Sequence, residues 1–368
     1  MSFYYEYQKY KDYSFEDFFD AVTDLQVQNV LNKDKLTAED YLTLLSPKAT
    51  KYLEEMAQKA HEITVRHFGK TIQMYAPIYV SNYCTNQCVY CGFNTTNKIH
   101  RKQLTLEEVE EEAKCIASTG IRHIILLTGD ARGIATVEYI KECVKVLRKY
   151  FSSIAIEVYA MSEDEYVQLK EAGVDSFTMY QETYDEELYD CLHARGPKKN
   201  YRFRLDAPER ACKARMRSVN IGALLGLNEQ WRKDAFFTGL HARYLQNKYL
   251  DTEISISLPR IRPHEGSFQP GCIVSDRDMV QMMVAFRLFM PRGGITISTR
   301  ERASFRDNII RLGVTKMSAG SSTVVGGYAQ KSKEAGQFDI SDERSVKEMR
   351  EAILRLGYQP VFKDWEAM

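Results

Sequence analysis

The stretch TLEEVEEEAKCIASTGIRHIILLTGD, residues 105–130, contains the pattern that decides the fold. Its first half places apolar residues at helical spacing behind Thr105, a residue type that caps helices well. Its second half is a short apolar run, which is typical of a buried strand. A helix that leads directly into such a strand is the repeating unit of parallel α/β folds. We therefore predict a helix from about Leu106 and a strand that ends near Asp130.

The same unit recurs on both sides of this stretch. Upstream, TIQMYAPIYVSN (71–82) is rich in β-branched and aromatic residues and predicts a first strand. Downstream, helical patterns alternate with apolar runs as far as TKMSAGS (315–321), so that eight strands lie between about residues 72 and 322. Eight units predict a closed (β/α)8 barrel of the TIM type. The alternative is an open doubly wound sheet, which usually has fewer units and a glycine-rich first turn.

Two further segments flank the barrel, which is assigned residues 71–322. Residues 1–70 carry charged and apolar residues at helical spacing and predict an N-terminal helical extension that ends at Gly69. Residues 323–368 contain a glycine-rich loop and one helical pattern, DERSVKEMREAILRLG (342–357). They predict a C-terminal helical tail that packs on the barrel.

Charge and hydropathy argue against several classes of function. The 368 residues include 50 basic and 50 acidic ones, so no long-range field attracts nucleic acid or an acidic membrane. No uncharged apolar run approaches the roughly 18 residues that cross a bilayer. Residues 1–20 lack the basic and apolar regions of a signal peptide. We expect a cytoplasmic protein with neither nucleic acid nor membrane as a partner.

Three of the eight cysteines lie in one short segment, Cys84-Thr-Asn-Gln-Cys88-Val-Tyr-Cys91, at the end of the first predicted strand. A structural zinc site, or a closed electron-transfer cluster, needs a fourth ligand, and the sequence has no second C-x2-C pair. The spacing therefore favours a 4Fe-4S cluster with one open iron, and zinc is the alternative. The remaining cysteines are interpreted as packing residues: Cys115, Cys143, Cys191, Cys212 and Cys272.

This spacing, with an aromatic residue directly before the last cysteine, resembles the signature of the radical S-adenosylmethionine (SAM) superfamily. The resemblance implies that Cys84, Cys88 and Cys91 hold the cluster and that its open iron binds SAM. Reductive cleavage of SAM would then release a 5′-deoxyadenosyl radical. The resemblance also implies that Tyr90 lies near the adenine, and packing of the loop is the alternative role for this residue.

Other residues at predicted strand ends resemble the SAM-binding positions of the superfamily. Thr128-Gly129-Asp130 matches the motif whose backbone binds the methionyl ammonium group, although family members often have glutamate in place of Asp130. Glu182, at the end of the fourth predicted strand, and Arg204, before the next helix, match positions that contact SAM. An acid and an arginine together can hold a zwitterion. All lie at the carboxyl ends of strands, where barrel enzymes place their sites.

Further matches over nearly the whole chain resemble the aromatic amino acid lyases of this superfamily, in particular the tyrosine lyases of thiamine thiazole biosynthesis. The matching segments follow the same order: YQETY (180–184), IGALLGL (221–227), SISLPRIRP (255–263), AFRLFMP (285–291), ISTRE (297–301), FRD (305–307), GGY (326–328) and QPVFKDW (359–365).

That resemblance implies cleavage of the Cα–Cβ bond of L-tyrosine, begun by removal of a hydrogen atom from the amino group. The products would be dehydroglycine (2-iminoacetate), p-cresol, 5′-deoxyadenosine and methionine. It also implies a flavodoxin- or ferredoxin-type electron donor and a thiazole synthase that receives the dehydroglycine.

A tyrosine substrate needs a cation for its carboxylate, and Arg300, at the end of the seventh predicted strand, is our candidate for that contact. Ser318 and Ser321, in the last predicted strand, could add hydroxyl hydrogen bonds. Arg260 and Arg262 lie at another strand end and compete with Arg300 for the same role.

Three alternative functions stay open at this point. A lyase for tryptophan or for a deazaflavin precursor would differ only in its substrate pocket. The tyrosine lyase of iron hydrogenase maturation carries three further cysteines in a C-terminal extension, whereas this sequence has no cysteine after Cys272. A non-catalytic iron-sulfur or zinc-binding barrel would leave SAM intact.

Overall fold

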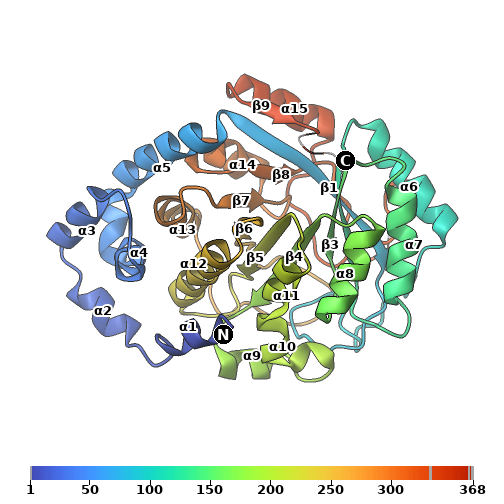
Figure 1. The fold of residues 1–368 in the computed structure, drawn as a ribbon, viewed down its shortest axis with the longest axis horizontal. Helices are drawn as coiled ribbons and strands as arrows, with labels where there is room; N and C mark the ends of the chain where they lie inside the picture. Colours follow the sequence, from blue (N-terminus) through green and yellow to red (C-terminus); the bar gives the residue numbers. More distant parts are fainter. Residues whose placement is uncertain (1, 331–333, 364, 366–368) are drawn as a thin grey trace.

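A ring of eight parallel strands forms the centre of the molecule in a computed structural model, which describes residues 2–330, 334–363 and 365. Strands β2 to β8 follow one another in the sheet, and β1 pairs with both β8 and β2, which closes the ring (Figure 1). The predicted α/β barrel is confirmed. The strands are β1 (Thr71–Ser81), β2 (His123–Thr128), β3 (Ser153–Glu157), β4 (Ser176–Glu182), β5 (Ser218–Ala223), β6 (Glu253–Ser257), β7 (Gly294–Ile297) and β8 (Lys316–Ser318).

Helices connect successive strands around the outside of the ring. The helix predicted from Leu106 begins there, because Thr105 and Glu108 form a capping box, in which each side chain accepts the other residue's backbone N–H. The segment between β4 and β5 contains three short helices in place of one. The connecting helices are α6 (Leu106–Ser118), α7 (Val137–Leu147), α8 (Glu163–Ala172), α9 (Glu186–Leu192), α10 (Tyr201–Leu205), α11 (Ala207–Lys213), α12 (Trp231–Lys248), α13 (Asp276–Phe289) and α14 (Ala303–Ile309).

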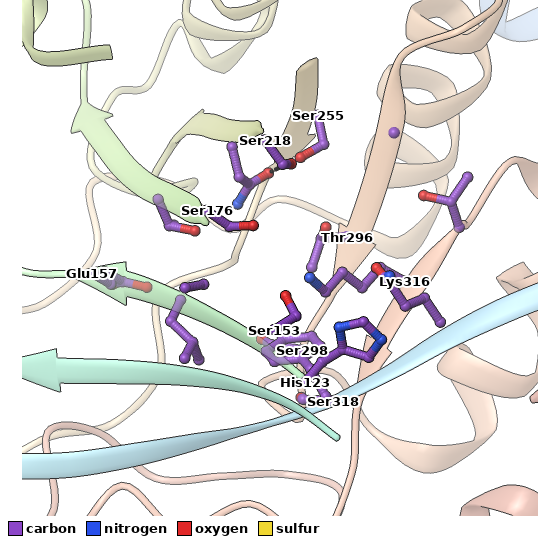
Figure 2. Close-up of a pocket in the computed structure, with 18 of the residues that line it drawn as sticks. His123, Ser153, Glu157, Ser176, Ser218, Ser255, Thr296, Ser298, Lys316 and Ser318 are labelled. Carbon is purple, nitrogen blue, oxygen red and sulfur yellow. Dashed lines mark hydrogen bonds between the residues drawn. The ribbon is translucent and has the colours of Figure 1, made fainter. Parts of the chain in front are cut away.

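The inner face of the barrel carries many small polar side chains among apolar ones. Because alternate residues of a strand point to the same side, one set from each strand faces inward. In the half near the strand starts, many of these are short hydroxyl side chains, and the barrel encloses a cavity of about 990 Å³. Barrel interiors of this kind are usually filled by bulky branched side chains. Figure 2 shows the inward hydroxyl side chains Ser153, Ser176, Ser218, Ser255, Thr296 and Ser298.

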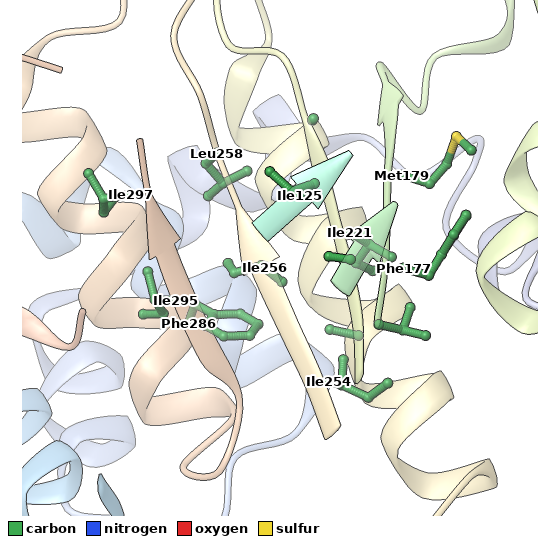
Figure 3. Close-up of a cluster of buried hydrophobic side chains, with 14 of the residues drawn as sticks. Ile125, Phe177, Met179, Ile221, Ile254, Ile256, Leu258, Phe286, Ile295 and Ile297 are labelled. Atoms are coloured by element: carbon green, nitrogen blue, oxygen red, sulfur yellow. The ribbon is translucent and has the colours of Figure 1, made fainter. Parts of the chain in front are cut away.

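The outer face of the same strands is apolar and packs against the helices. Ile254 and Ile256 of β6 and Ile295 and Ile297 of β7 are buried beside Phe286 of α13 (Figure 3). Full burial of one such side chain stabilises the fold by about 1.5–3 kcal/mol. The helical shell therefore holds the ring in shape, and the interior is left for a ligand.

The N-terminal helices lie against one side of the barrel. Helices α4 and α5 contact α12 and α13, on the left of Figure 1. The last of these helices, α5, ends at Phe68, and the next residue, Gly69, has a φ of 65°. The sequence analysis predicted that the helical extension ends at Gly69. They are α1 (Tyr4–Gln8), α2 (Phe15–Ala21), α3 (Asp24–Leu31), α4 (Ala38–Leu45) and α5 (Leu53–Phe68).

The C-terminal segment contains the expected helix, α15 (Val346–Arg355), and a strand that the sequence analysis did not predict. This strand, β9 (Gln359–Val361), adds to the outside of the ring by pairing in parallel with β1. It has three residues and contains Pro360, so its pattern gives no strand signal. The boundaries of the three predicted domains stay a prediction.

Two of the five cysteines interpreted as packing residues are exposed, and Cys272 is half-buried. Cys115 on α6 and Cys191 on α9 are exposed, because each occupies the solvent side of its helix, whereas Cys143 and Cys212 are buried. Within the described ranges, no helix has the length and apolar character that a membrane crossing requires.

Candidate active site

The cysteine loop, residues 84–91, follows β1 at the carboxyl end of the barrel. Its backbone, together with Gly92, is fixed by hydrogen bonds to three segments that are distant in sequence. The backbone N–H of Thr85 donates to the carbonyl of Asp130 at 2.9 Å, and that of Gln87 donates to Arg195 at 2.8 Å. The backbone N–H of Gly92 donates to the carbonyl of Gln337 at 3.2 Å. The loop is therefore held in place by the rest of the barrel mouth.

The three cysteines of this loop fit a 4Fe-4S cluster. All are free thiols, and amide nitrogens of Asn86 and Gln337 lie 3.8 and 3.9 Å from the sulfurs of Cys84 and Cys91. Hydrogen bonds to the cysteine sulfurs help to set the reduction potential of an iron-sulfur cluster. Burial raises the pKa of Cys88 to about 12, so its thiolate needs a nearby cation.

The arrangement does not fit a single metal ion. In the part of the chain that the structure describes, no three His, Cys, Asp or Glu side chains converge on one ion position. A four-iron cluster does not require such convergence, because each thiolate binds a different iron atom. The three separate thiols are therefore compatible with a four-iron cluster.

The turn after β2 touches the cysteine loop. A Cβ atom on Gly129 would stand 2.2 Å from the carbonyl oxygen of Tyr83, so only glycine fits there. The Asp130 carboxylate accepts a hydrogen bond from the Asn86 amide at 2.8 Å, which helps to fix the loop. Among the described residues, Oγ1 of Thr128 and Oδ1 of Asp130 are buried with no hydrogen-bond partner. Such orphaned oxygens are expected where a ligand binds.

Glu182 and Arg204, which the sequence analysis singled out, lie together. Nη2 of Arg204 is 3.3 Å from Oε1 of Glu182, and Nζ of Lys198 is 2.6 Å from the same oxygen. Burial alone would raise the pKa of Glu182, but Lys198 and Arg204 hold it below its usual value. Glu182 also has a φ of 74°, a strained conformation that clusters at functional sites.

Tyr90 is anchored by His193. The two side chains are joined by a hydrogen bond of 2.7 Å at Nε2 of His193. Nδ1 of His193 lies 2.7 Å from the carbonyl oxygen of Tyr189 and must donate to it, so Nε2 accepts from the Tyr90 hydroxyl. Burial and Lys198 lower the pKa of His193 to about 3, so this ring is neutral. The adenine contact of Tyr90 stays a prediction.

Arg300, Ser318 and Ser321 share the wall of the central cavity. The guanidinium carbon of Arg300 lies 3.4 Å from the ring centre of Phe338, and the group makes no hydrogen bond or ion pair within the described residues. Oγ of Ser321 is likewise buried without a partner there. Oγ of Ser318 accepts a hydrogen bond of 3.1 Å from the Thr299 backbone. The predicted carboxylate-binding arginine is therefore available to a ligand.

The competing arginines are elsewhere. Arg260 makes ion pairs with Glu301 and, at 2.8 Å, with Asp276 at the start of α13. Neither Arg260 nor Arg262 contributes to the wall of the cavity. The geometry favours Arg300 for the contact with the substrate, because the charge of Arg260 is already neutralised.

Several residues of this region escaped the sequence analysis. Glu157 ends β3 and faces the cavity (Figure 2). Its signal was an acidic residue at the end of an apolar strand, the same signal that identified Glu182. Lys198 lies in a short turn between α9 and α10, and nothing in the local pattern distinguishes it from its neighbour Lys199.

The tail also contributes to the mouth of the barrel. Oε1 of Gln337 accepts a hydrogen bond of 2.8 Å from the Tyr79 hydroxyl, and its Nε2 approaches Cys91. The next residue, Phe338, packs on Arg300. This segment therefore links the cysteine loop to the cavity, and its loop-like composition gave no hint of that.

Comparison with known proteins identifies the family. The chain is 39% identical over 345 residues to 2-iminoacetate synthase of Escherichia coli (strain K12), which covers 94% of this chain and 92% of that protein. It is 37% identical, with the same coverage, to 2-iminoacetate synthase of Salmonella typhimurium (strain LT2). The chain belongs to the 2-iminoacetate synthase family of radical SAM enzymes. The resemblance described above is confirmed.

Two family models match successive parts of this radical SAM enzyme. Residues 78–238 match the radical SAM superfamily, and residues 257–359 match the biotin and thiamin synthesis associated domain. A solved structure of HydG, a maturase of the FeFe-hydrogenase, superposes with a TM-score of 0.86 at 30% identity, over 98% of this chain and 79% of that one. Membership of the family implies a 4Fe-4S cluster, SAM and a source of electrons.

Proposed function

We propose that this chain cleaves the Cα–Cβ bond of L-tyrosine to give dehydroglycine and p-cresol, with SAM as cosubstrate. One observation carries the proposal beyond the family likeness: the Arg300 guanidinium faces an internal cavity with no hydrogen-bond or ion-pair partner in the described chain. A cation that faces an internal cavity without a partner can be stabilised by an anion that binds there. The carboxylate of an amino acid substrate is such an anion.

The cysteine loop would hold the cluster through Cys84, Cys88 and Cys91. A reduced cluster with SAM bound supplies a 5′-deoxyadenosyl radical, which can remove a hydrogen atom from the substrate amino group. The chain's own part is to hold the thiolates, to donate N–H groups toward them from Asn86 and Gln337, and to keep water away.

The residues around the turn after β2 would bind SAM. The backbone of Thr128, Gly129 and Asp130 would meet the methionyl ammonium group, and the orphaned oxygens there support this role. Glu182 and Arg204 would hold the rest of the methionyl zwitterion, and Tyr90 would lie beside the adenine. The two cations next to Glu182 keep that carboxylate ionised and able to accept hydrogen bonds.

The substrate would lie in the cavity on the other side of the mouth. Arg300 would bind the tyrosine carboxylate through its paired N–H groups, and Ser321 and Ser318 would add hydroxyl contacts. Phe338, packed on Arg300, would exclude water from the reacting end. Exclusion of water matters because dehydroglycine hydrolyses readily.

The same proposal includes two protein partners, one that accepts the product and one that reduces the cluster. A thiazole synthase would receive the dehydroglycine, and a flavodoxin or ferredoxin would supply the electron. Cytoplasmic location stays a prediction.

The proposal is tested by product analysis after anaerobic reconstitution and dithionite reduction. With SAM and L-tyrosine, p-cresol and 5′-deoxyadenosine should form together. Deoxyadenosine without p-cresol would reject tyrosine as the substrate, and a parallel reaction with tryptophan would test the nearest rival. SAM that stays intact would indicate an electron carrier instead of an enzyme.

A further inference from the structure

Glu157 is an acidic side chain inside the barrel that has no direct partner among residues 2–330, 334–363 and 365. It ends β3 on the inward-facing set of residues, and its carboxyl lines the central cavity. Within the described part of the chain it makes no hydrogen bond and no ion pair, although Arg300 acts on it through space. Buried carboxylates are rarely left in this state unless a ligand completes them.

The surroundings of Glu157 make its charge sensitive to a ligand. Burial raises its pKa to about 7, and the positive charge of Arg300 only partly offsets that effect. The charged and titratable groups that face it come from several elements of the barrel mouth and wall: Arg300 after β7, Glu182 and Tyr180 on β4, Arg204 on α10, Lys198 before α10, and Tyr75 and Tyr79 on β1.

Arg300 and Glu157 therefore present opposite charges to one cavity, each without a direct partner. An α-amino acid carries a carboxylate and an ammonium group on one carbon, so it can satisfy both at once. If the substrate carboxylate binds Arg300, its ammonium group needs an acceptor, and Glu157 is the acidic side chain that the described wall offers at the strand ends and that has no ion pair of its own.

We propose that Glu157 binds the α-ammonium group of the substrate and takes one proton from it before the radical step. The transfer converts the ammonium and the Glu157 carboxylate into a neutral amine and a carboxylic acid, with no electron moved. A neutral amine is the form from which loss of a hydrogen atom leaves an uncharged nitrogen radical. This role rests on the proposed cleavage of tyrosine and deepens it.

Binding gives a test that does not depend on turnover. L-tyrosine and 3-(4-hydroxyphenyl)propanoate, which lacks the amino group, are titrated calorimetrically into the reconstituted protein at pH 8. Glu157→Gln should weaken tyrosine binding roughly 10- to 100-fold, the range for a charge-assisted contact. Binding of the propanoate should be nearly unchanged. Glu157→Asp should restore part of the preference, and Thr178→Val, on the same wall, should leave it intact.

The pH dependence gives a second test that a merely structural glutamate would not pass. Glu157 accepts a proton only when ionised, so kcat/KM of the wild-type enzyme for tyrosine should fall as pH drops through about 7. The Glu157→Gln enzyme should have a lower kcat/KM at high pH. Its kcat/KM should not show this fall toward low pH, which we call the acid limb. If the variant does not fold, the wild-type preference for tyrosine over the propanoate should still decrease below pH 7.

Two results would overturn the inference. One is a Glu157→Gln enzyme with wild-type tyrosine affinity and an unchanged acid limb; the other is an equal loss of affinity for both ligands. Wild-type protein that forms no p-cresol would instead contradict the proposed function, so the two failures are distinguishable.

Discussion

Two acidic residues end neighbouring strands of this barrel, and their surroundings differ. Glu182, the last residue of β4, is held by Lys198 and Arg204 before any ligand arrives. Glu157, the last residue of β3, and Arg300, after β7, face the cavity without such partners in the described chain. The first group, which we call the closed triad, is already satisfied, whereas the second, the open pair, is not. The comparison teaches that one side of the mouth is preorganised and that the other is completed by its ligand.

The difference follows from where the partners lie in the chain. Lys198 and Arg204 come from the connection between β4 and β5, 16 and 22 residues after Glu182, so one connecting segment brings both to it. The two members of the open pair come from strands on different parts of the ring and both point inward. The cavity that both line, of about 990 Å³, has room for an amino acid. The following variants break or sharpen this contrast, from the largest expected effect to the smallest.

Cys88→Ala should abolish the function of both sides, because neither SAM nor tyrosine can be cleaved without the cluster. We expect loss of the cluster's visible absorbance after anaerobic reconstitution, and loss of both p-cresol and 5′-deoxyadenosine. Cys191→Ser, at an exposed position on α9, serves as the control and should behave as wild type. A Cys88→Ala protein with normal absorbance and turnover would refute the ligand assignment.

Arg300→Ala should impair only the open pair. Loss of a charge-assisted contact to the tyrosine carboxylate should lower kcat/KM for tyrosine roughly 10- to 100-fold. Slow uncoupled cleavage of SAM should persist. Arg302→Ala removes a neighbouring arginine that pairs with Asp276 at the surface, and it should change neither rate. Equal loss of tyrosine and SAM cleavage in Arg300→Ala would indicate a structural arginine.

Glu182→Gln should impair only the closed triad. The change leaves Lys198 and Arg204 facing a neutral amide, and we expect SAM affinity to fall about tenfold, a loss of about 1.4 kcal/mol. Equilibrium dialysis with labelled SAM measures the effect. Glu186→Gln removes a surface ion pair with Lys11 and should be close to neutral. Tyrosine affinity that fell as far as SAM affinity would contradict the separation of the two groups.

Gln337→Leu tests the link between the two sides. It removes the hydrogen bond from Tyr79 and the amide near Cys91, so we expect a decrease of about 0.5–1.5 kcal/mol in the free energy of unfolding. Denaturant unfolding of the cluster-free protein measures this directly. Gln330 is exposed in the same C-terminal region, so Gln330→Leu should decrease the free energy of unfolding by less. A larger loss at Gln330 would show that the tail is not fixed through Gln337.

The sequence was sufficient for the fold because a barrel repeats one local pattern. Thr105 and Gly69 mark helix ends by local chemistry, and the apolar runs between the helical patterns form the strands. The cysteine spacing and the strand-end residues Glu182 and Arg300 were also visible, because parallel strands bring their carboxyl ends together.

What the sequence could not reveal depends on distant contacts. Whether Arg260 or Arg300 is free for a ligand is decided by Glu301 and Asp276, whose positions become known only in the folded chain. The role of Gln337 depends on a loop that crosses the barrel mouth. The polar interior was also missed, because a run of strand residues was interpreted as apolar on both faces.

The origin of the abstracted hydrogen atom tests the central claim most directly. When the reaction is run in deuterium oxide with ordinary L-tyrosine, the exchangeable amino group carries deuterium. Mass spectrometry should then find one deuterium in 5′-deoxyadenosine, and p-cresol should form together with it. 5′-Deoxyadenosine without solvent deuterium, together with transfer from tyrosine deuterated on carbon, would contradict an open pair that presents the amino group to the radical.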